Sequence, residues 1–96
     1  MAVKILIKRK IPEKIKEPVF NTLIRQLRLL ATQEPGYISG ETLLRIDKPN
    51  EYLVISTWKD VAAWNMWKEN KQRTEIQRQI DALLKEPTQY EVYGHL

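Results

Sequence analysis

The chain has 96 residues, of which 43% are hydrophobic and 29% are charged, and it contains no cysteine. This length suits one domain with one modest core, so we expect residues 1–96 to form a single domain. The absence of cysteine excludes disulfides, thiolate metal sites and cysteine nucleophiles. With His95 as its one histidine, the chain also lacks the residues for a histidine-rich metal site or a Ser-His-Asp triad. No stretch reaches the roughly 18 apolar residues of a membrane span, and no signal-peptide pattern is present. The sequence therefore predicts a cytoplasmic protein without a membrane partner.

The formal net charge is +4, from 16 lysines and arginines against 12 acidic residues. A basic balance can indicate a nucleic-acid partner. Here the basic residues are dispersed, and the densest run is Lys8-Arg9-Lys10. The chain has no aromatic RNA-binding motif, no glycine loop of the KH type and no helix-turn-helix pattern. We expect a solvated surface and no nucleic-acid partner.

The first half of the chain reads as a strand, a helix and a second strand. Residues 3–7 alternate in the manner of a strand, which Pro12 ends. Apolar residues then recur at three- and four-residue steps over residues 15–30, the pattern of an amphipathic helix with Pro18 in its first turn. Glu34-Pro35-Gly36 is expected to end this helix, and residues 37–46 form the second strand.

The second half repeats this order. Lys48-Pro49-Asn50-Glu51 suits a tight turn, so residues 51–58 should pair with the second strand as a hairpin. Asp60 is a predicted cap for a short helix over residues 61–69. Asn70 should cap a third helix, which carries an apolar stripe and ends near Glu86-Pro87. Residues 88–93 form the last strand.

The order βαββαβ predicts an α+β fold of the ferredoxin-like type. It has a four-stranded antiparallel sheet with its helices on one face, because the crossovers are right-handed. The first and third strands should be central, since residues 3–7 and 53–55 are the most apolar segments.

Both faces of this sheet carry apolar residues. In the third strand Leu53 and Ile55 point one way, whereas Tyr52 and Val54 point the other. A face without helices would then expose more apolar surface than monomers usually show. We therefore predict a homodimer in which two copies join through their open sheet faces.

The residues offer little support for acid–base, nucleophilic or metal chemistry. No serine or threonine has a neighbouring base, the acidic residues lack metal-ligand spacing, and the three glycines are isolated. The notable feature is a group of three tryptophans, Trp58, Trp64 and Trp67. One interpretation is that they fill the core. The other is a flat-walled pocket for a planar aromatic ligand, with Phe20 and Ile24 on its opposite side.

Residues 34–81 resemble the antibiotic biosynthesis monooxygenase family. The resemblance is carried by the Pro-Gly-Tyr start of the second strand, the Ser-Thr-Trp end of the third and the Trp-x-x-Trp helix. It extends over essentially the whole chain and implies a dimeric α+β barrel. Members include cofactor-independent oxygenases of quinols and anthrones, haem-degrading oxygenases and small proteins without an assigned reaction.

The resemblance implies a monooxygenase that acts on a small planar aromatic or quinol-type compound without a cofactor. Trp67 falls at the position of the family's pocket tryptophan and, with Trp64, could stack the ring. Tyr37, Tyr52 and Asn65 are the polar candidates for bonding the substrate oxygen.

Two other functions stay open at this point. One is a non-catalytic homodimer of the same fold that binds a small ligand. The other is a haem-handling protein, which is disfavoured. Ile7 and Lys8 stand near the position of that branch's strand-one asparagine, and Gln77 stands where the branch has its histidine. Neither region offers an imidazole for iron.

Overall fold

A computed structural model describes residues 1–12, 17–84 and 86–96 of the chain. Four strands and three helices follow one another in the order β1 (Val3–Lys10), α1 (Glu17–Ala31), β2 (Tyr37–Leu44), β3 (Glu51–Trp58), α2 (Val61–Lys68), α3 (Lys71–Leu83) and β4 (Gln89–Gly94). Two helices occupy the second crossover. This is the predicted ferredoxin-like α+β fold, with its βαββαβ order confirmed.

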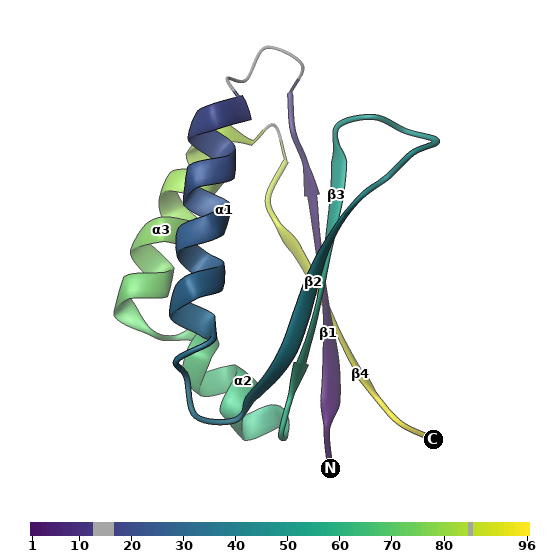
Figure 1. Ribbon diagram of the computed structural model, residues 1–96, viewed down its shortest axis with the longest axis vertical. Coiled ribbons are helices and arrows are strands. Elements are labelled where there is room, and N and C mark those ends of the chain that lie inside the picture. The colour runs from purple at the N-terminus through teal and green to yellow at the C-terminus, as the bar shows by residue number, and fades with distance from the viewer. Residues whose placement is uncertain (13–16, 85) are drawn as a thin grey trace.

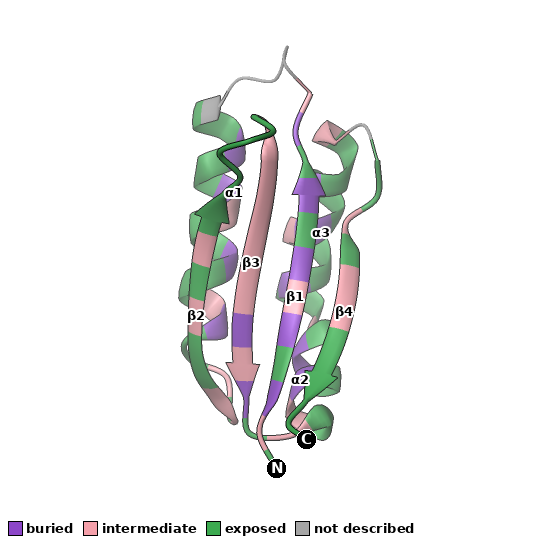
Figure 2. Cartoon of the chain, turned by 90° about the vertical axis from the view of Figure 1, so that its right-hand side faces the viewer, coloured by how far each residue is buried: buried purple, intermediate pink, exposed green. Residues whose placement is uncertain are grey.

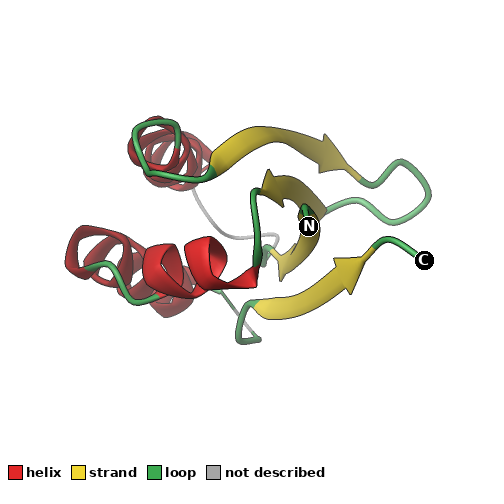
Figure 3. Ribbon diagram, turned by 90° about the horizontal axis from the view of Figure 1, so that it is seen from below, coloured by secondary structure: helices red, strands yellow, loops and turns green. Residues whose placement is uncertain are grey.

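The strands form one antiparallel sheet in the order β2-β3-β1-β4, so β1 and β3 are central as predicted. The helices lie together on one side of the sheet, and the other face is left open (Figure 1). The view from below separates the same two layers (Figure 3). At one end of the sheet, Val3 lies between Trp58 of β3 and Gly94 of β4. Among the described helices, none is both long and apolar enough to cross a membrane.

The element ends differ from the predicted ones by a few residues. β1 continues to Lys10, and α1 and α3 end at Ala31 and Leu83, each before its Glu-Pro pair. After α1 the amide of Glu34 donates to the carbonyl of Ala31 at 3.0 Å, so a tighter turn replaces the last helical turn. Pro18 lies in the first turn of α1 as expected. Ile15, which was assigned to this helix, lies outside the described residues.

The two turns that join β2 to its neighbours depend on left-handed backbone. Asn50 has a φ of 77°, which suits the third position of a type II turn after Pro49. Gly36 has a φ of 88°, and a β-carbon there would lie 2.5 Å from the β-carbon of Ala63. A glycine is therefore required where the loop before β2 touches α2.

The core lies between the sheet and the helices. Alternate residues of β1 face the helices, and the burial colours of this strand alternate accordingly (Figure 2). The buried apolar residues are Val3, Ile5, Ile7, Ile11, Phe20, Leu23, Leu27, Ala31, Trp58, Trp64, Trp67 and Ile80. The strand register places a second apolar group on the open face: Leu6, Leu43, Leu53, Ile55 and Tyr93. Both faces of the sheet are thus apolar, as the sequence predicts.

Candidate functional site

The structure has two hollows of interest, one on each side of the sheet. The larger, which we call the outer pocket, has a volume of about 510 Å³ and lies on the open face. The smaller, the inner cavity, has a volume of about 60 Å³ and lies between the sheet and the helices. Size alone favours the outer pocket, but the chemistry of the linings favours the other.

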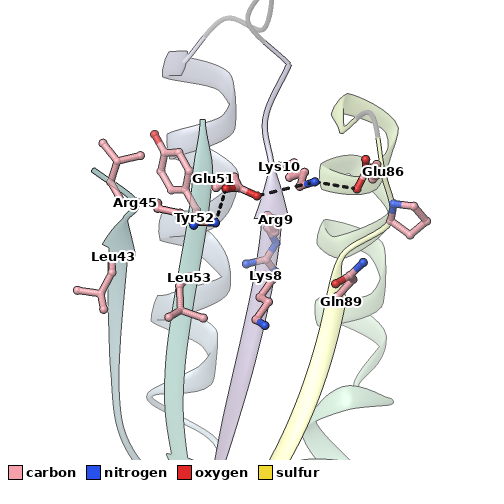
Figure 4. Close-up of a pocket in the computed structure, with 12 residues that line it drawn as sticks. Lys8, Arg9, Lys10, Leu43, Arg45, Glu51, Tyr52, Leu53, Glu86 and Gln89 are labelled. Carbon is pink, nitrogen blue, oxygen red and sulfur yellow. Dashed lines mark hydrogen bonds and ion pairs between the residues drawn. The ribbon is translucent and has the colours of Figure 1, made fainter. Parts of the chain in front are cut away.

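The outer pocket is lined by charged side chains that neutralise one another (Figure 4). Glu51 accepts from Arg45 at 2.9 Å and lies 3.8 Å from the ammonium of Lys10, which also lies 3.7 Å from Glu86. These pairs are largely exposed to solvent, so each contributes little. Leu53 supplies apolar surface beside them. This arrangement of paired, exposed charges beside apolar surface is typical of a surface that meets another protein surface. Arg9 also borders this pocket, but its side chain is buried beneath it.

The inner cavity combines aromatic walls with polar side chains. Its lining comes from β1, α1, β2, β3, α2 and α3, and consists of Ile7, Arg9, Ile24, Leu27, Arg28, Ala31, Tyr37, Gly40, Glu41, Thr42, Val54, Ser56, Trp58, Trp67 and Arg73. The cavity opens to solvent past the exposed side chains of Arg28 and Glu41. A mostly apolar hollow with a few converging polar groups is the usual form of a small-molecule site. We therefore take the inner cavity as the candidate site.

Two of the three tryptophans form one wall of the inner cavity. The rings of Trp58 and Trp67 are stacked, with centroids 6.2 Å apart and an angle of 24° between their planes. Trp58 is fully buried and donates from Nε1 to Oγ of Ser56 at 3.1 Å, which fixes its ring. Trp64 does not line the cavity; it contacts Trp58 and Tyr90. All three tryptophans belong to the core, and Trp58 and Trp67 are the two that also border the cavity.

The other predicted site residues are divided between the cavity and elsewhere. Tyr37 and Ile24 line it. Phe20 is buried in the core with its ring edge-on to Tyr52 at 5.3 Å, and Tyr52 lines the outer pocket. Asn65 is exposed on α2. Its position two residues from Trp67 turns it away from the buried face of the helix, and it is not among the residues that line the cavity. The assignment of Asn65 as a partner of the substrate oxygen stays a prediction.

The side chain of Tyr37 packs against Gly40 at the wall of the cavity. Its ring meets Trp58 edge to face at 5.3 Å, and the β2 ladder shifts register between Tyr37 and Ser39. The hydroxyl lies above Gly40, where a β-carbon would come within 2.7 Å of it. The strand is therefore irregular beside Gly40, and this irregularity places a phenol hydroxyl at the cavity wall.

Sequence reasoning missed the charged residues of the site. Arg9 is only 4% exposed, and its Nη2 donates to Oε1 of Gln77 at 2.9 Å. Gln77 is held in turn by Asp81 at 3.0 Å and Thr88 at 2.9 Å. Within the described part of the chain, Nε of Arg9 is buried without a hydrogen-bond partner. The pKa of Arg9 is lowered to about 10, chiefly by burial and also by nearby Arg73, while Tyr90 and Asp81 partly oppose the change. Arg9 is therefore still a cation at neutral pH.

Arg73 of α3 lies near Arg9 and is also buried. Its Nη2 donates to the hydroxyl of Tyr90 at 2.7 Å and its Nη1 to the carbonyl of Lys68 at 3.3 Å. The guanidinium lies 5.7 Å from the ring centroid of Trp64. Asn70 caps α3 by accepting from the amide of Arg73 at 3.0 Å, which fixes the start of the helix.

The sequence does contain a signal for these residues. Arg9 continues the inward alternation of Val3, Ile5 and Ile7, and Arg73 and Gln77 share a helix face with Ile80. In the described ranges, no three His, Cys, Asp or Glu side chains lie close enough to hold a metal. Gln77, which stands where the haem branch has its histidine, is committed to bonds with Arg9, Asp81 and Thr88.

Comparison with known families identifies the class of protein. The family model described as antibiotic biosynthesis monooxygenase matches residues 7–79. The chain therefore belongs to the antibiotic biosynthesis monooxygenase family. A comparison with curated proteins finds no significant match.

Solved structures share the fold over nearly the full length at low sequence identity. A conserved protein from Methanosarcina mazei is 19% identical, with a TM-score of 0.89 and coverage of 97% of this chain and 91% of its own. SnoaB from Streptomyces nogalater, a cofactor-independent oxygenase, is 16% identical, with a TM-score of 0.86 and coverage of 99% and 93%. Rv0793 from Mycobacterium tuberculosis is 14% identical, with a TM-score of 0.88 and coverage of 100% and 96%.

Proposed function

We propose that this protein is a cofactor-independent monooxygenase that oxidises a small planar aromatic compound of the quinol type. The stacked pair of Trp58 and Trp67 beside the hydroxyl of Tyr37 is the observation that carries this proposal. Membership of the monooxygenase family supports the reaction class. The cofactor-independent oxygenase SnoaB has the same fold, which supports chemistry without a bound cofactor.

In the proposed reaction the substrate supplies the electrons. A deprotonated quinol transfers one electron to O2, and the resulting radicals combine at a ring carbon that carries hydrogen. Loss of water from this peroxide leaves one oxygen atom on the ring as a carbonyl. The protein's part is to hold the ring in one orientation, exclude water and stabilise the anion.

Each of these tasks has a candidate residue. The ring of Trp67 is a flat surface against which an aromatic ring can stack. The hydroxyl of Tyr37 lies at the cavity wall above Gly40, where it can bond to the substrate oxygen. Ile24 and Leu27 of α1 form the apolar side of the cavity opposite the sheet.

The size of the cavity restricts the ligand. An engineered cavity that admits benzene has a volume of about 150 Å³. The inner cavity measures about 60 Å³, so even one ring requires side chains of α1 to move away from the sheet. We therefore propose a substrate with one ring rather than a polycyclic one.

The test is oxygen consumption with hydroquinone and methylhydroquinone, measured above the rate without protein. We expect wild type to accelerate uptake and Trp67→Phe to lose about tenfold of the acceleration, because the smaller ring leaves a gap in the wall. Met66→Ala, an exposed position on the same helix, is the matched control. Labelled O2 should place one heavy oxygen atom in the product. A rate no higher than background would contradict the proposal.

A second candidate function is a non-catalytic protein that binds a small ligand in the same cavity. The small volume of the cavity favours it. So does the position of Glu41, which is the one carboxylate among the described lining residues and is exposed to solvent. Ligand-induced quenching of tryptophan fluorescence without oxygen uptake would support this function.

We also propose that two copies associate through their open sheet faces. Leu6, Leu43, Leu53, Ile55 and Tyr93 would be removed from water at this interface. The outer pocket and its ion pairs lie on the same face, so the partner would cover them. Family membership supports this assembly, and analytical ultracentrifugation tests it.

A further inference from the structure

The inner cavity contains more positive charge than its own residues balance. Three arginines line it, Arg9, Arg28 and Arg73, and one carboxylate, Glu41. Glu41 is exposed and lies opposite Ile55, which the register places on the open face of the sheet. In the described part of the chain, neither Arg9 nor Arg73 has an acidic residue within ion-pair distance. A buried cation without a counter-charge is unusual in a protein interior.

The position of Arg9 is fixed, and part of its hydrogen-bonding capacity is unused. It reaches from β1 to Gln77 on α3, and Gln77 is anchored to Asp81 and Thr88. These bonds hold the guanidinium in one orientation through a single Nη2 donor. The buried Nε has no hydrogen-bond partner among residues 1–12, 17–84 and 86–96. A buried donor left unpaired in this way destabilises the fold, so a fixed and unpaired Nε indicates a group that arrives from outside the chain.

We propose that the inner cavity binds a one-ring aromatic carboxylate, with the carboxylate of the ligand paired to Arg9. The Nε edge of a guanidinium offers N–H donors in the planar geometry that a carboxylate accepts. Trp67 and Trp58 contact the ring, and Arg73 adds a second positive charge nearby. The low pKa of Arg9, which burial causes, would rise when the anion binds.

This inference rests on the proposed function, which identifies the ring of the ligand as a hydroquinone. It adds a carboxylate as a second feature of the ligand. The matched probes are gentisate, which is a hydroquinone with a carboxylate, and gentisamide, its neutral primary amide. Both can form a phenolate, so a difference between them reports the carboxylate alone. Quenching of tryptophan fluorescence measures binding at neutral pH, because two of the three tryptophans line the cavity.

We expect wild type to bind gentisate about tenfold or more tightly than gentisamide, the size of effect typical of a hydrogen bond to a charged group. Arg9→Met should remove this preference while leaving the affinity for gentisamide within about twofold. Arg9→Lys should retain part of it, since the charge stays but the planar donors are lost. Arg78→Met, at an exposed arginine on α3, should behave as wild type. Thermal unfolding of each variant verifies that it is folded.

Equal binding of the two probes by wild type, or no binding of either, would overturn the inference. So would a preference for gentisate that persists in Arg9→Met. Oxygen uptake distinguishes this inference from the proposed function. If gentisate binds through Arg9 without oxygen uptake, the monooxygenase proposal fails and the acid-binding site stands. If neutral hydroquinones are oxidised and wild type shows no preference for gentisate, the monooxygenase proposal stands and the acid-binding site is refuted.

Discussion

The hydroxyl of Tyr37 occupies the space in which a side chain at Gly40 would begin. A β-carbon at residue 40 would lie 2.7 Å from this oxygen and 3.6 Å from the adjoining ring carbon. The bulge between Tyr37 and Ser39 turns the tyrosine along the inner face of β2, towards Trp58. The position of the phenol in the candidate site thus depends on the absence of a side chain three residues away.

The first prediction is that Gly40→Ala displaces Tyr37 from the inner cavity. We expect a loss of about 1–2 kcal/mol in the free energy of unfolding, because the added methyl group overfills a packed region. Oxygen uptake and ligand affinity should fall together with it. Gly94→Ala is the control, since a β-carbon there meets nothing within 4 Å. If Gly40→Ala matched the control in stability and ligand affinity, Tyr37 would have no fixed place in the site.

The second prediction is that Arg9→Met makes the protein more stable. Burial lowers the pKa of Arg9 to about 10, which corresponds to a penalty of about 3 kcal/mol for keeping the charge inside the fold. Methionine removes this penalty but leaves Oε1 of Gln77 without its donor, so we expect a net gain of about 1–2 kcal/mol at neutral pH. Chemical denaturation measures it. A clear loss of stability would show that Arg9 serves the fold rather than a ligand.

The sign of the pH effect follows from the same pKa. The folded state binds the proton of Arg9 less tightly than the unfolded state does, so the charged form opposes folding at every pH below about 10. Stability attributable to this group rises as the pH increases above about 10. The difference in unfolding free energy between wild type and Arg9→Met should therefore shrink above that pH. The control Arg78→Met should lack this dependence.

The third prediction is that substitutions of two asparagines, Asn70 at the start of α3 and Asn65 within α2, have different effects. Asn70→Ala should cost about 1 kcal/mol, since it removes the cap that accepts from the amide of Arg73. It should also weaken ligand binding, because the cap fixes the first turn of α3, which carries Arg73. Asn65→Ala, at an exposed site within α2, should change stability by no more than about 0.5 kcal/mol and leave oxygen uptake unchanged. An activity loss in Asn65→Ala would return this residue to the site.

The fourth prediction concerns the open sheet face. Leu53→Lys should convert a dimer into a species of 11.4 kDa at micromolar concentration, because it buries a charge in the proposed interface. Leu29→Lys introduces the same charge on α1, where the leucine is 61% exposed, and should leave the dimer intact. Analytical ultracentrifugation measures both. A wild-type chain that sediments as a monomer would refute the proposed interface.

The fold could be predicted because local signals and burial agree. The caps at Asp60 and Asn70, the Pro49-Asn50 turn and the period of two in β1 each depend on neighbours in sequence. Neither α1 nor α3 continues into its Glu-Pro pair, as predicted, but each helix ends before that pair is reached. The helices stop earlier because the chain tightens before the proline, as the bonds from Glu34 to Ala31 and from Leu84 to Asp81 show.

The site could be predicted only in part. The group of three tryptophans was expected, and Trp64 and Trp67 are both buried on α2. Their spacing did not show that Trp58 stacks on Trp67 while Trp64 turns to Tyr90. Arg9 was read as the middle of a solvated basic run. Its burial depends on Gln77, which is 68 residues away, and only the folded sheet and α3 bring the two together. The charge of the run did not reveal this burial, whereas the alternation of Val3, Ile5 and Ile7 places Arg9 on the inner side of the strand.

The pairing of Val3 with Gly94 has a practical consequence for handling the chain. The two ends leave the sheet side by side, at the end near α2 (Figures 1 and 2). The hairpin turn around Pro49 and Asn50 lies at the other end. A short linker could therefore join the ends, and new termini could be opened at that turn. An affinity tag on either native end would likewise stand clear of the outer pocket.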